Sequence, residues 1–438
     1  MLELPGMERT DTTRLLTRVR GMALFREVLG SPETKEFLAL LALLSEEEPS
    51  PGVVADTFGQ LWEGLALGAG TLLPDAWQSY LVGRILDSEN SFSLSAEKGE
   101  PGDLLLEQAC LDLRTLQSLF ELDAESVFGM IEDAVPGLTE MWVPWTMPES
   151  AEDSARHKVA RKLSESEDWA AGAELLADYY ARHGAGQFGR YKVFRWSAGH
   201  LHPVTKPDPS RLTDLIGYED ERAPLLENTE RLLAGLPSHH ALLYGLPGTG
   251  KSSTVKALLN EYAEYGLRLV EVAKGDLGDL PRVLDKLRDR GPRFILFVDD
   301  LSFEEHEVEY KSLKALLEGS VEAPPENVRL YATSNRRNII RESFSDRDEP
   351  GDDVHARDTM HEKLSLAARF GLRITFPAPD QKQYLEIVRG IVRERGIQIS
   401  ESDLVERALL WDRWHAGRSG RTARQFVDEL EAGLAENR

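Results

Sequence analysis

The chain has 438 residues, of which 41% are hydrophobic and 29% are charged. Such a composition is typical of a globular protein, and the length allows about two to four domains. The formal net charge is −24, which argues against a protein that coats a nucleic-acid duplex through a basic surface. The single cysteine, Cys110, excludes an internal disulfide and a cysteine-based zinc cage.

The N-terminal residues lack the basic and apolar regions of a signal peptide. The longest apolar run, residues 37–44, is too short to cross a bilayer and is interpreted as part of a buried helix. We therefore expect a cytoplasmic protein without a membrane partner.

Residues 1–196 are predicted to form a mostly helical N-terminal domain. Apolar residues recur there at spacings of three and four, which is the period of an amphipathic helix. The acidic excess is concentrated in this half, as is typical of a solvated or protein-facing surface. Residues 197–210 contain Pro203, Pro207 and Pro209 and are predicted to be a linker.

A basic and aromatic stretch ends the helical half. Four cations, Arg182, Arg190, Lys192 and Arg195, interleave with the aromatic residues 188, 191, 194 and 196. This pattern allows a small nucleic-acid patch, because aromatic rings stack on bases and cations contact phosphates. The spacing of three also fits the buried face of an amphipathic segment that docks one domain on the next.

After the linker, short apolar runs alternate with amphipathic helical patterns. We predict strands at residues 241–244, 267–272, 294–298, 328–333 and 372–376. Runs that are apolar throughout indicate strands covered on both faces, as in a parallel α/β sheet. The predicted fold is α/β, with a helical domain followed by a P-loop core over residues 211–378.

Residues 245–252, with the sequence GLPGTGKS, match the phosphate-loop pattern GxxxxGK[ST] at every fixed position. The loop follows a predicted strand and precedes a helical pattern. Backbone N–H groups, a helix N-terminus and a lysine together bind phosphates. Lys251 is expected to contact the β- and γ-phosphates of ATP, and Ser252 to ligate Mg²⁺. The candidate nucleotide-binding residues here are Gly245, Gly248, Thr249, Gly250, Lys251, Ser252 and Ser253.

A second acidic element follows the predicted strand at 294–298. Asp299 and Asp300 come directly after this strand, which would place them at the edge of the sheet beside the phosphate loop. Asp299 is a candidate Mg²⁺ ligand, and Asp300 is a candidate base that activates the attacking water. Aspartate is shorter than the glutamate common at this position, so Glu304 or Glu305 remains an alternative base.

With these motifs, the chain resembles AAA+ ATPases and, more closely, the bacterial family catalogued as domain of unknown function 815. The resemblance covers residues 183 to about 430, which is more than half of the chain. The segments that carry it are residues 183–196, 215–219, 243–262, 294–305, 330–337, 363–372 and 420–426.

The resemblance implies roles for two residues of the core. Asn335 matches the polar residue that ends a strand and orients the attacking water, although asparagine also favours plain turns. Arg369 matches the arginine that AAA+ proteins present to a neighbouring subunit. A surface ion pair is the alternative for this arginine, and Arg373 and Arg347 are weaker rivals.

The resemblance also implies a helical lid over residues 379–438. Arg421 matches the sensor that reaches the γ-phosphate within its own subunit, with Arg424 or a simple surface charge as alternatives. Ile216 and Gly217 match the segment that cradles adenine, although a core strand explains them nearly as well. Residues 273–278 lack the aromatic residue of a substrate-threading pore loop.

Three functions remain open from the sequence. The first is a homo-oligomeric ATPase in which MgATP binding and hydrolysis move the N-terminal domain against an unknown protein partner. The second is a nucleotide-gated scaffold with negligible hydrolysis. The third is a nucleic-acid-coupled ATPase that uses the basic and aromatic stretch at 182–196. The two consecutive aspartates resemble those of replication initiators and helicase loaders.

Overall fold

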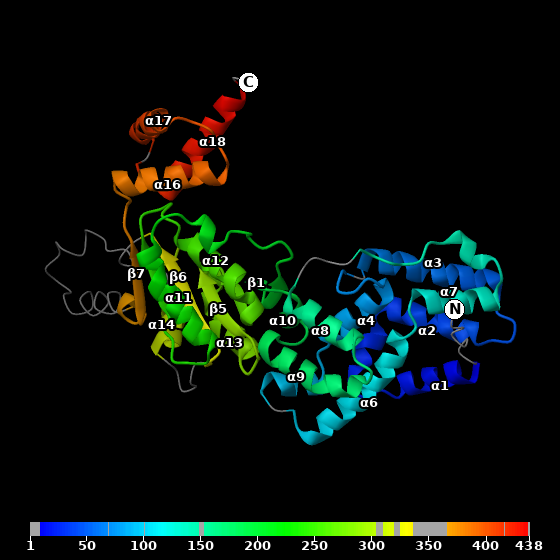
Figure 1. Cartoon of the computed structure of the whole chain (residues 1–438). Helices are drawn as coiled ribbons and strands as arrows, with labels where there is room; N and C mark the ends of the chain where they lie inside the picture. Colours follow the sequence, from blue (N-terminus) through cyan, green and yellow to red (C-terminus); the bar gives the residue numbers. More distant parts are fainter. Residues whose placement is uncertain are drawn as a thin grey trace. The chain divides into compact units, whose positions relative to one another are not determined.

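The computed structural model describes residues 9–68, 70–99, 101–148, 153–303, 310–318, 325–335, 366–415 and 417–436. The chain divides into two compact units (Figure 1). The first consists of Met1–Arg190 with Arg290–Pro292, and the second of Tyr191–Asp289 with Arg293–Arg438. No helix in the described ranges is both long enough and apolar enough to cross a membrane.

The first unit is built from helices around one hydrophobic core. Aromatic side chains are prominent in this core, where Phe37 stacks on Trp77 with ring centroids 3.7 Å apart. The helices are α1 (Arg9–Arg20), α2 (Pro32–Leu44), α3 (Pro51–Gly68), α4 (Ala76–Leu86), α5 (Ser91–Glu97), α6 (Asp103–Phe120), α7 (Ala124–Ala134), α8 (Ala155–Ser164), α9 (Gly172–His183) and α10 (Gln187–Arg190).

Carboxylates fix several helix ends in this unit. The side chain of Asp75 caps α4 by accepting a hydrogen bond from Gln78 N, at 2.9 Å, and its other oxygen accepts from Ala124 N, at 2.8 Å. One side chain therefore satisfies the N-termini of both α4 and α7, where backbone N–H groups otherwise lack partners.

The second unit contains a seven-stranded sheet with the order β2-β1-β4-β5-β6-β3-β7. All neighbouring strands are parallel except the pair β1 and β2. In the register of the centre, Val270 lies opposite Leu296, and Leu296 lies opposite Leu330. The strands are β1 (Val193–Ser197), β2 (His200–Pro203), β3 (Ala241–Gly245), β4 (Leu267–Val272), β5 (Arg293–Val298), β6 (Val328–Ser334) and β7 (Leu372–Phe376).

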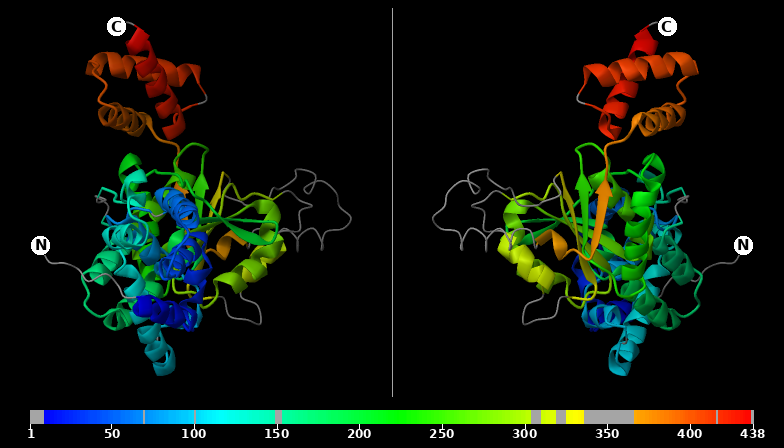
Figure 2. Two further views of the ribbon diagram at one scale, coloured as in Figure 1. Left: turned by 90° about the vertical axis from the view of Figure 1, so that its right-hand side faces the viewer. Right: turned by 90° about the vertical axis from the view of Figure 1, so that its left-hand side faces the viewer.

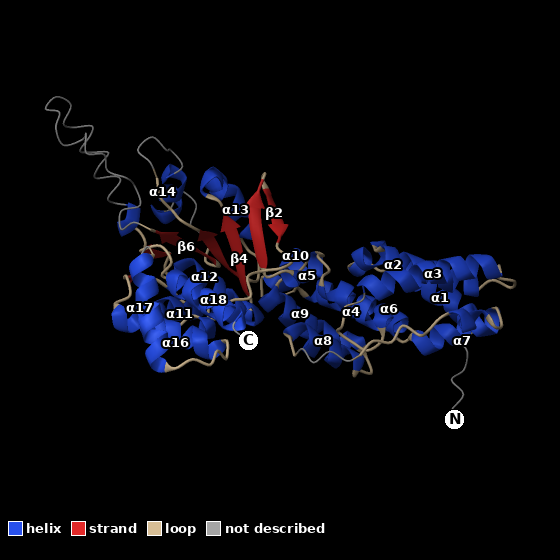
Figure 3. Ribbon diagram, turned by 90° about the horizontal axis from the view of Figure 1, so that it is seen from above, coloured by secondary structure: helices blue, strands red, loops and turns tan. Residues whose placement is uncertain are grey.

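Helices cover both faces of this sheet, as a parallel sheet requires. Figure 3 shows α11 (Glu219–Leu233) and α12 (Lys251–Tyr262) on one side of the strands. On the other side are α13 (Leu280–Leu287) and α14 (Tyr310–Glu318). Strand β7 leads into three C-terminal helices, drawn in orange to red in Figure 2. They are α16 (Gln381–Glu394), α17 (Glu401–Trp414) and α18 (Gly420–Glu436).

The predicted α/β fold class is confirmed, and the five predicted strands are present as β3 to β7 with bounds that agree to within one residue. The sheet is larger than predicted at one edge. Residues 193–196 are predicted at the end of the helical domain and residues 197–203 in the linker, but Val193–Ser197 and His200–Pro203 form strands β1 and β2. The helical unit correspondingly ends at Arg190.

Most aromatic side chains of the basic and aromatic stretch at 182–196 are buried. Phe188, Phe194 and Trp196 are at most 1% exposed, and Tyr191 is half-buried. Three of its cations pair with acids. They are Lys192 with Glu264 and Arg195 with Glu271, each at 2.9 Å, and Arg190 with Asp87 at 3.9 Å. The interpretation of the spacing as a buried face is the one that the structure favours.

Candidate nucleotide site

The phosphate loop connects β3 to α12, and close packing requires two of its glycines. Gly245 has φ of 150°, and a Cβ atom there would lie 2.0 Å from the carbonyl oxygen of Phe376, at the end of β7. Gly248 has φ of 79°, and its Cβ atom would lie 3.0 Å from Arg421 Cβ. Glycine therefore lets the loop approach both the sheet and α18 closely.

Lys251 is the first residue of α12 and is 6% exposed. Its ammonium group donates hydrogen bonds to the carbonyl oxygens of Gly245 and Leu246, at 2.9 and 2.8 Å, and to Asn335 Oδ1, at 3.1 Å. Burial lowers the pKa of Lys251, and the negative charges of Asp299 and Asp300 oppose that shift. The lysine is thus held within the loop by oxygen atoms alone.

The acidic pair follows β5. Asp299 Oδ1 accepts hydrogen bonds from Ser252 Oγ and Thr333 Oγ1, each at 2.5 Å. Asp300 has φ of 52°, which is unusual for a residue other than glycine. Its backbone N–H donates to Thr333 Oγ1 at 2.9 Å, and its carboxylate accepts from Asn335 Nδ2 at 2.7 Å. Lys251, Ser252, both aspartates, Thr333 and Asn335 therefore form one hydrogen-bonded network.

The opposite wall of the site is formed by residues 214–218. Arg222, which is 7% exposed, donates to the carbonyl oxygen of Leu215, and the N–H of Gly217 donates to Glu219 Oε1 at 2.9 Å. A Cβ atom at Gly390 would lie 2.3 Å from Ile216 Cδ1. The absence of a side chain at this position thus lets Ile216 pack against α16.

Helix α18 meets the phosphate loop at its first turn. The N–H of Arg421 donates to the carbonyl oxygen of Gly248 at 3.2 Å. The hydroxyl of Ser419 accepts from the N–H of Thr422 at 3.0 Å, which satisfies one of the free donors at the start of this helix. The side chain of Arg421 is exposed and lines the cleft.

These elements surround a cleft of about 600 Å³ in the second unit. The structure brings most of the predicted site residues to it, whereas Gly245 and Arg369 do not line it. The predicted residues on its lining are Ile216, Gly217, Gly248, Thr249, Gly250, Lys251, Ser252, Ser253, Asp299, Asp300, Asn335 and Arg421.

Other lining residues were not identified from the sequence. Thr333 is hydrogen-bonded to both aspartates from the neighbouring strand, Arg222 is hydrogen-bonded to nearby Leu215, and Asp428 lies on α18. Arg424, named before only as an alternative to Arg421, also lines the cleft. A usable signal existed for Thr333, because it ends a predicted strand two residues before Asn335.

Four more candidates come from the sequence. Glu304, Glu305 and Arg347 lie outside the described residues. Arg369 is half-buried and lies three residues before β7.

The donor set suits a nucleoside triphosphate with Mg²⁺. The positive end of α12 and the Lys251 ammonium provide the potential that phosphates need. The Ser252 hydroxyl and the Asp299 carboxylate are hard oxygen ligands, which Mg²⁺ prefers, and their hydrogen bond places the two oxygens side by side. Apolar side chains of Ile216, Ile387 and Ile391 line the same cleft and suit the face of a base.

The parallel sheet and the loop GLPGTGKS define a P-loop protein. The chain belongs to the family described as "Protein of unknown function (DUF815)", whose model matches residues 189–434.

The chain is also similar to part of several curated proteins. It is 36% identical to the replication factor C large subunit of Staphylothermus marinus over 74 residues, which is 17% of each chain. It is 25% identical to the 26S proteasome regulatory subunit 6B homolog of Encephalitozoon cuniculi over 200 residues, which cover 42% of this chain and 46% of that protein. The chain thus spans less than half the length of these curated relatives.

Among solved structures, the chain is similar to the RuvB Holliday junction branch migration motor of Thermotoga maritima. The match covers 52% of this chain and 66% of that chain, with 19% identity and a TM-score of 0.36.

Proposed function

We propose that the chain is a MgATP-dependent ATPase that couples nucleotide binding and hydrolysis to a conformational change of its helical N-terminal unit. The observation that supports this best is the hydrogen-bonded network at the ends of β5 and β6. It joins a phosphate-loop lysine, a hydroxyl and carboxylate suited to Mg²⁺, and a second carboxylate beside an amide.

In this proposal, Lys251 exchanges its carbonyl partners for the β- and γ-phosphate oxygens. Ser252 and Asp299 hold Mg²⁺, which, when bound, neutralises charge on the transferred phosphoryl group. Thr333 fixes the orientation of the Asp299 carboxylate through its hydrogen bond. Ile216 and Gly217 contact the base.

Asp300 and Asn335 act on the water. Their side chains are already hydrogen-bonded and exposed to the cleft. A water bound beside this pair can donate to the other oxygen of the Asp300 carboxylate and be oriented by the Asn335 amide, so Asp300 accepts its proton as the oxygen attacks. Arg421 reaches the γ-phosphate in its own subunit, and Arg369 acts on the site of a neighbouring subunit.

The test is ATP turnover with Mg²⁺, measured on the full chain over a range of protein concentrations. Lys251→Ala should abolish nucleotide binding or weaken it severely. The matched control is Lys256→Ala, because Lys256 lies on the same helix but is not part of the cleft lining. Normal turnover by Lys251→Ala would overturn the proposal.

One observation favours the nucleotide-gated scaffold as a second candidate. The Asp300 carboxylate is short and is already bound by Asn335, which withholds it from a water. This candidate predicts that wild type binds ATP in a Lys251-dependent way with no turnover above the Lys251→Ala blank. Asp300→Asn separates the two candidates, because it should slow an ATPase and leave a scaffold unchanged.

A further inference from the structure

A tripeptide between α13 and β5 belongs to the helical unit rather than to the sheet unit. The chain leaves the second unit after Asp289, contributes Arg290–Pro292 to the first unit, and re-enters the second unit at Arg293. Arg293 is the first residue of β5. The strand that carries the two aspartates is thus joined directly to a segment that packs in another unit.

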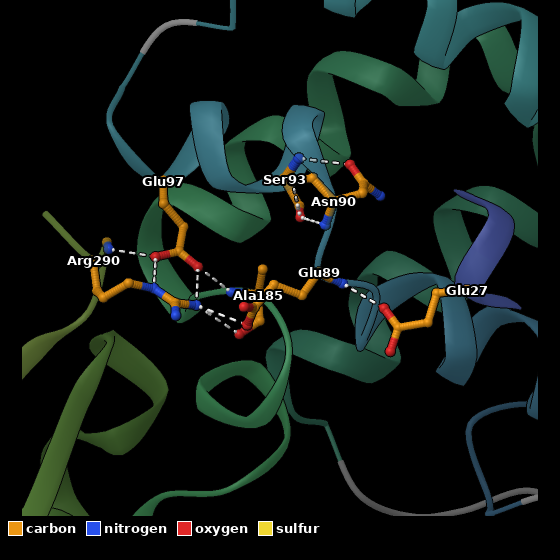
Figure 4. Close-up of polar contacts among 8 residues, drawn as sticks. Glu27, Glu89, Asn90, Ser93, Glu97, Ala185 and Arg290 are labelled. Atoms are coloured by element: carbon orange, nitrogen blue, oxygen red, sulfur yellow. Dashed lines mark hydrogen bonds and ion pairs between the residues drawn. The ribbon is translucent and has the colours of Figure 1, made fainter. Parts of the chain in front are cut away.

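Glu97, at the end of α5, holds this tripeptide (Figure 4). Its side chain is fully buried, and its carboxylate accepts from Arg290 Nε at 2.7 Å and from Arg290 Nη2 at 2.8 Å. It also accepts from the N–H of Gly291 at 2.8 Å and from the N–H of Ala185 at 2.6 Å. Four donors therefore satisfy one buried carboxylate, in the two-pronged geometry that makes arginine pairs strong and directional.

Arg290 is held from other sides as well. Its Nη2 atom donates to the carbonyl oxygen of Ala185 at 3.1 Å and contacts Glu89 at 3.3 Å, and its guanidinium lies 4.6 Å from the centre of the Phe188 ring. Burial acts to lower the pKa of Arg290, but the hydrogen bonds and charge of Glu97 outweigh burial, so the pKa is raised. The guanidinium of Arg290 is thus held in its charged form at a largely buried position.

The backbone of the tripeptide fits without spare room. A Cβ atom at Gly291 would lie 2.7 Å from the carbonyl oxygen of Ala181, on α9. A Cβ atom at Gly184 would lie 2.7 Å from Pro292 Cγ. The contact between Glu97 and Arg290, hereafter the Glu97–Arg290 clip, is therefore part of a closely packed seat and not a loose surface ion pair.

Strand β5 connects the packed tripeptide to the two aspartates of the candidate site. It runs from Arg293 to Val298, is hydrogen-bonded to β4 and β6 on its two sides, and is followed by Asp299 and Asp300. A buried strand transmits strain along its length, because close-packed protein interiors are only slightly compressible. A displacement of its first residue is thus carried toward the aspartates.

We propose that the Glu97–Arg290 clip positions β5, so that the helical unit controls ATP hydrolysis through the placement of Asp299 and Asp300. This inference rests on the proposed function. Because Lys251 and the phosphate loop follow β3 rather than β5, opening the clip should reduce turnover and leave nucleotide affinity largely unchanged. Glu97 and Arg290 are positioning residues, since they do not line the cleft.

The test compares variants of the full chain. Arg290→Ala leaves a buried carboxylate unpaired and can compromise folding. The informative variant is therefore the double substitution Glu97→Gln with Arg290→Met, which removes both charges and keeps side chains of similar volume. We expect kcat to fall by about tenfold, because small displacements of catalytic groups have effects of that size, with the Kd for ATP unchanged within about twofold.

Two controls separate positioning from general damage. Arg282→Ala removes an exposed arginine of α13, and Glu89→Gln changes the outer partner of Arg290. Both should leave kcat near that of wild type. Arg290→Lys keeps the charge without the two-pronged contact and should give an intermediate kcat. A double variant with wild-type kcat, or with kcat and Kd changed together, would overturn the proposal.

A second measurement does not depend on turnover. The N–H groups of Ala185 and Gly291 both donate to Glu97, so their hydrogen exchange reports on the clip directly. In wild type, the protection of each of these two amides should differ between the MgATP-bound and the ADP-bound protein. In Lys251→Ala, adding either nucleotide should give the same protection. Equal protection in both nucleotide states would refute the coupling even if the chain hydrolyses ATP. Loss of ATP binding in wild type would instead refute the proposed function.

Discussion

At the scale of single residues, Thr333 ties the two aspartates together. Its hydroxyl donates to Asp299 and accepts from the N–H of Asp300, so one side chain sets the position of both candidate catalytic groups. The side chain itself is 2% exposed. A buried hydroxyl with two partners is costly to remove, because each partner loses a hydrogen bond at once.

We predict that Thr333→Val binds ATP normally and has a kcat reduced by about tenfold, since an unrestrained carboxylate is less well placed. The unpaired N–H of Asp300 should also reduce the free energy of unfolding by about 1–3 kcal/mol. Steady-state turnover and urea unfolding measure the two effects. Thr333→Ser keeps the hydroxyl and should restore both values. If valine and serine have equal kcat, Thr333 does not position Asp299.

The lowered pKa of Lys251 makes a second prediction at this scale. Burial favours the neutral amine in the free protein, whereas bound phosphates favour the ammonium, so ATP binding raises the pKa of Lys251. The affinity for ATP should be greatest at pH values below the pKa that Lys251 has in the free protein. It should fall as the pH rises through that pKa, and the fall should begin at a lower pH than for an ordinary lysine.

Calorimetric titration in buffers of different ionisation enthalpy measures this effect. Wild type should take up protons when it binds ATP at alkaline pH, and Lys256→Ala should behave in the same way. Proton uptake that is absent at every pH up to 10 would show that Lys251 stays fully charged in the free protein.

At the scale of elements, the sequence predicts the strands whose two faces are covered, but it does not predict the two strands at one edge of the sheet. Strands β3 to β7 are short and apolar, which is a local signal. Strands β1 and β2 are joined by a turn in which Ala198 and Gly199 have φ of 50° and 79°. Two positive φ values are typical of a tight hairpin turn, but alanine rarely adopts one, so the sequence does not signal this hairpin.

The candidate site likewise contains residues that the sequence predicts and residues that it does not. The phosphate loop and the two aspartates follow from local patterns, because their chemistry requires particular residues at fixed spacing. Asp428 lines the cleft from α18, and Ile387 and Ile391 line it from α16. Such positions depend on how these helices pack on the sheet, and no spacing in the sequence encodes them.

A buried histidine where β3 and β6 meet leads to a prediction about stability. His240 immediately precedes β3, and its Nδ1 atom accepts a hydrogen bond from the N–H of Leu330, in β6, at 2.9 Å. Burial, with smaller contributions from Arg329 and His239, lowers the pKa of His240 to about 4. The folded protein thus keeps this imidazole neutral where the unfolded chain binds a proton.

Stability should therefore fall as pH decreases from about 6.5, the ordinary histidine pKa, to about 4, with at most about 3 kcal/mol lost from this group. Urea unfolding of the full chain at pH 7 and pH 5 measures the loss. His240→Gln can still accept from Leu330 N–H but does not titrate, so its loss between these two pH values should be smaller. Equal losses in the two proteins would assign the acid sensitivity to other groups.

At the scale of the whole molecule, the candidate site supplies its own phosphate and metal ligands but not every cation that was predicted for hydrolysis. Arg421 lines the cleft of its own subunit, and Arg369 does not. Arg369 lies before β7. If this guanidinium stabilises charge on the transferred phosphoryl group, it does so in a second copy of the chain, and turnover per subunit must rise with protein concentration.

Mixing two inactive variants tests this in a way that single substitutions cannot. Arg369→Ala keeps its own phosphate loop, and Lys251→Ala keeps its own Arg369. Each variant alone should have turnover reduced by about a hundredfold or more, as for other arginines that act across an interface. The mixture should recover activity, because a Lys251→Ala subunit can present Arg369 to the intact site of an Arg369→Ala subunit.

Arg373→Ala is the matched control for the mixing experiment, since Arg373 is exposed on β7 only four residues away. This variant should be active alone, and its turnover per subunit should rise with protein concentration as that of wild type does. A mixture no more active than the sum of its parts would exclude a trans role for Arg369. If Arg373→Ala instead behaved as Arg369→Ala is expected to, the trans cation would lie on β7 itself rather than on the segment before it.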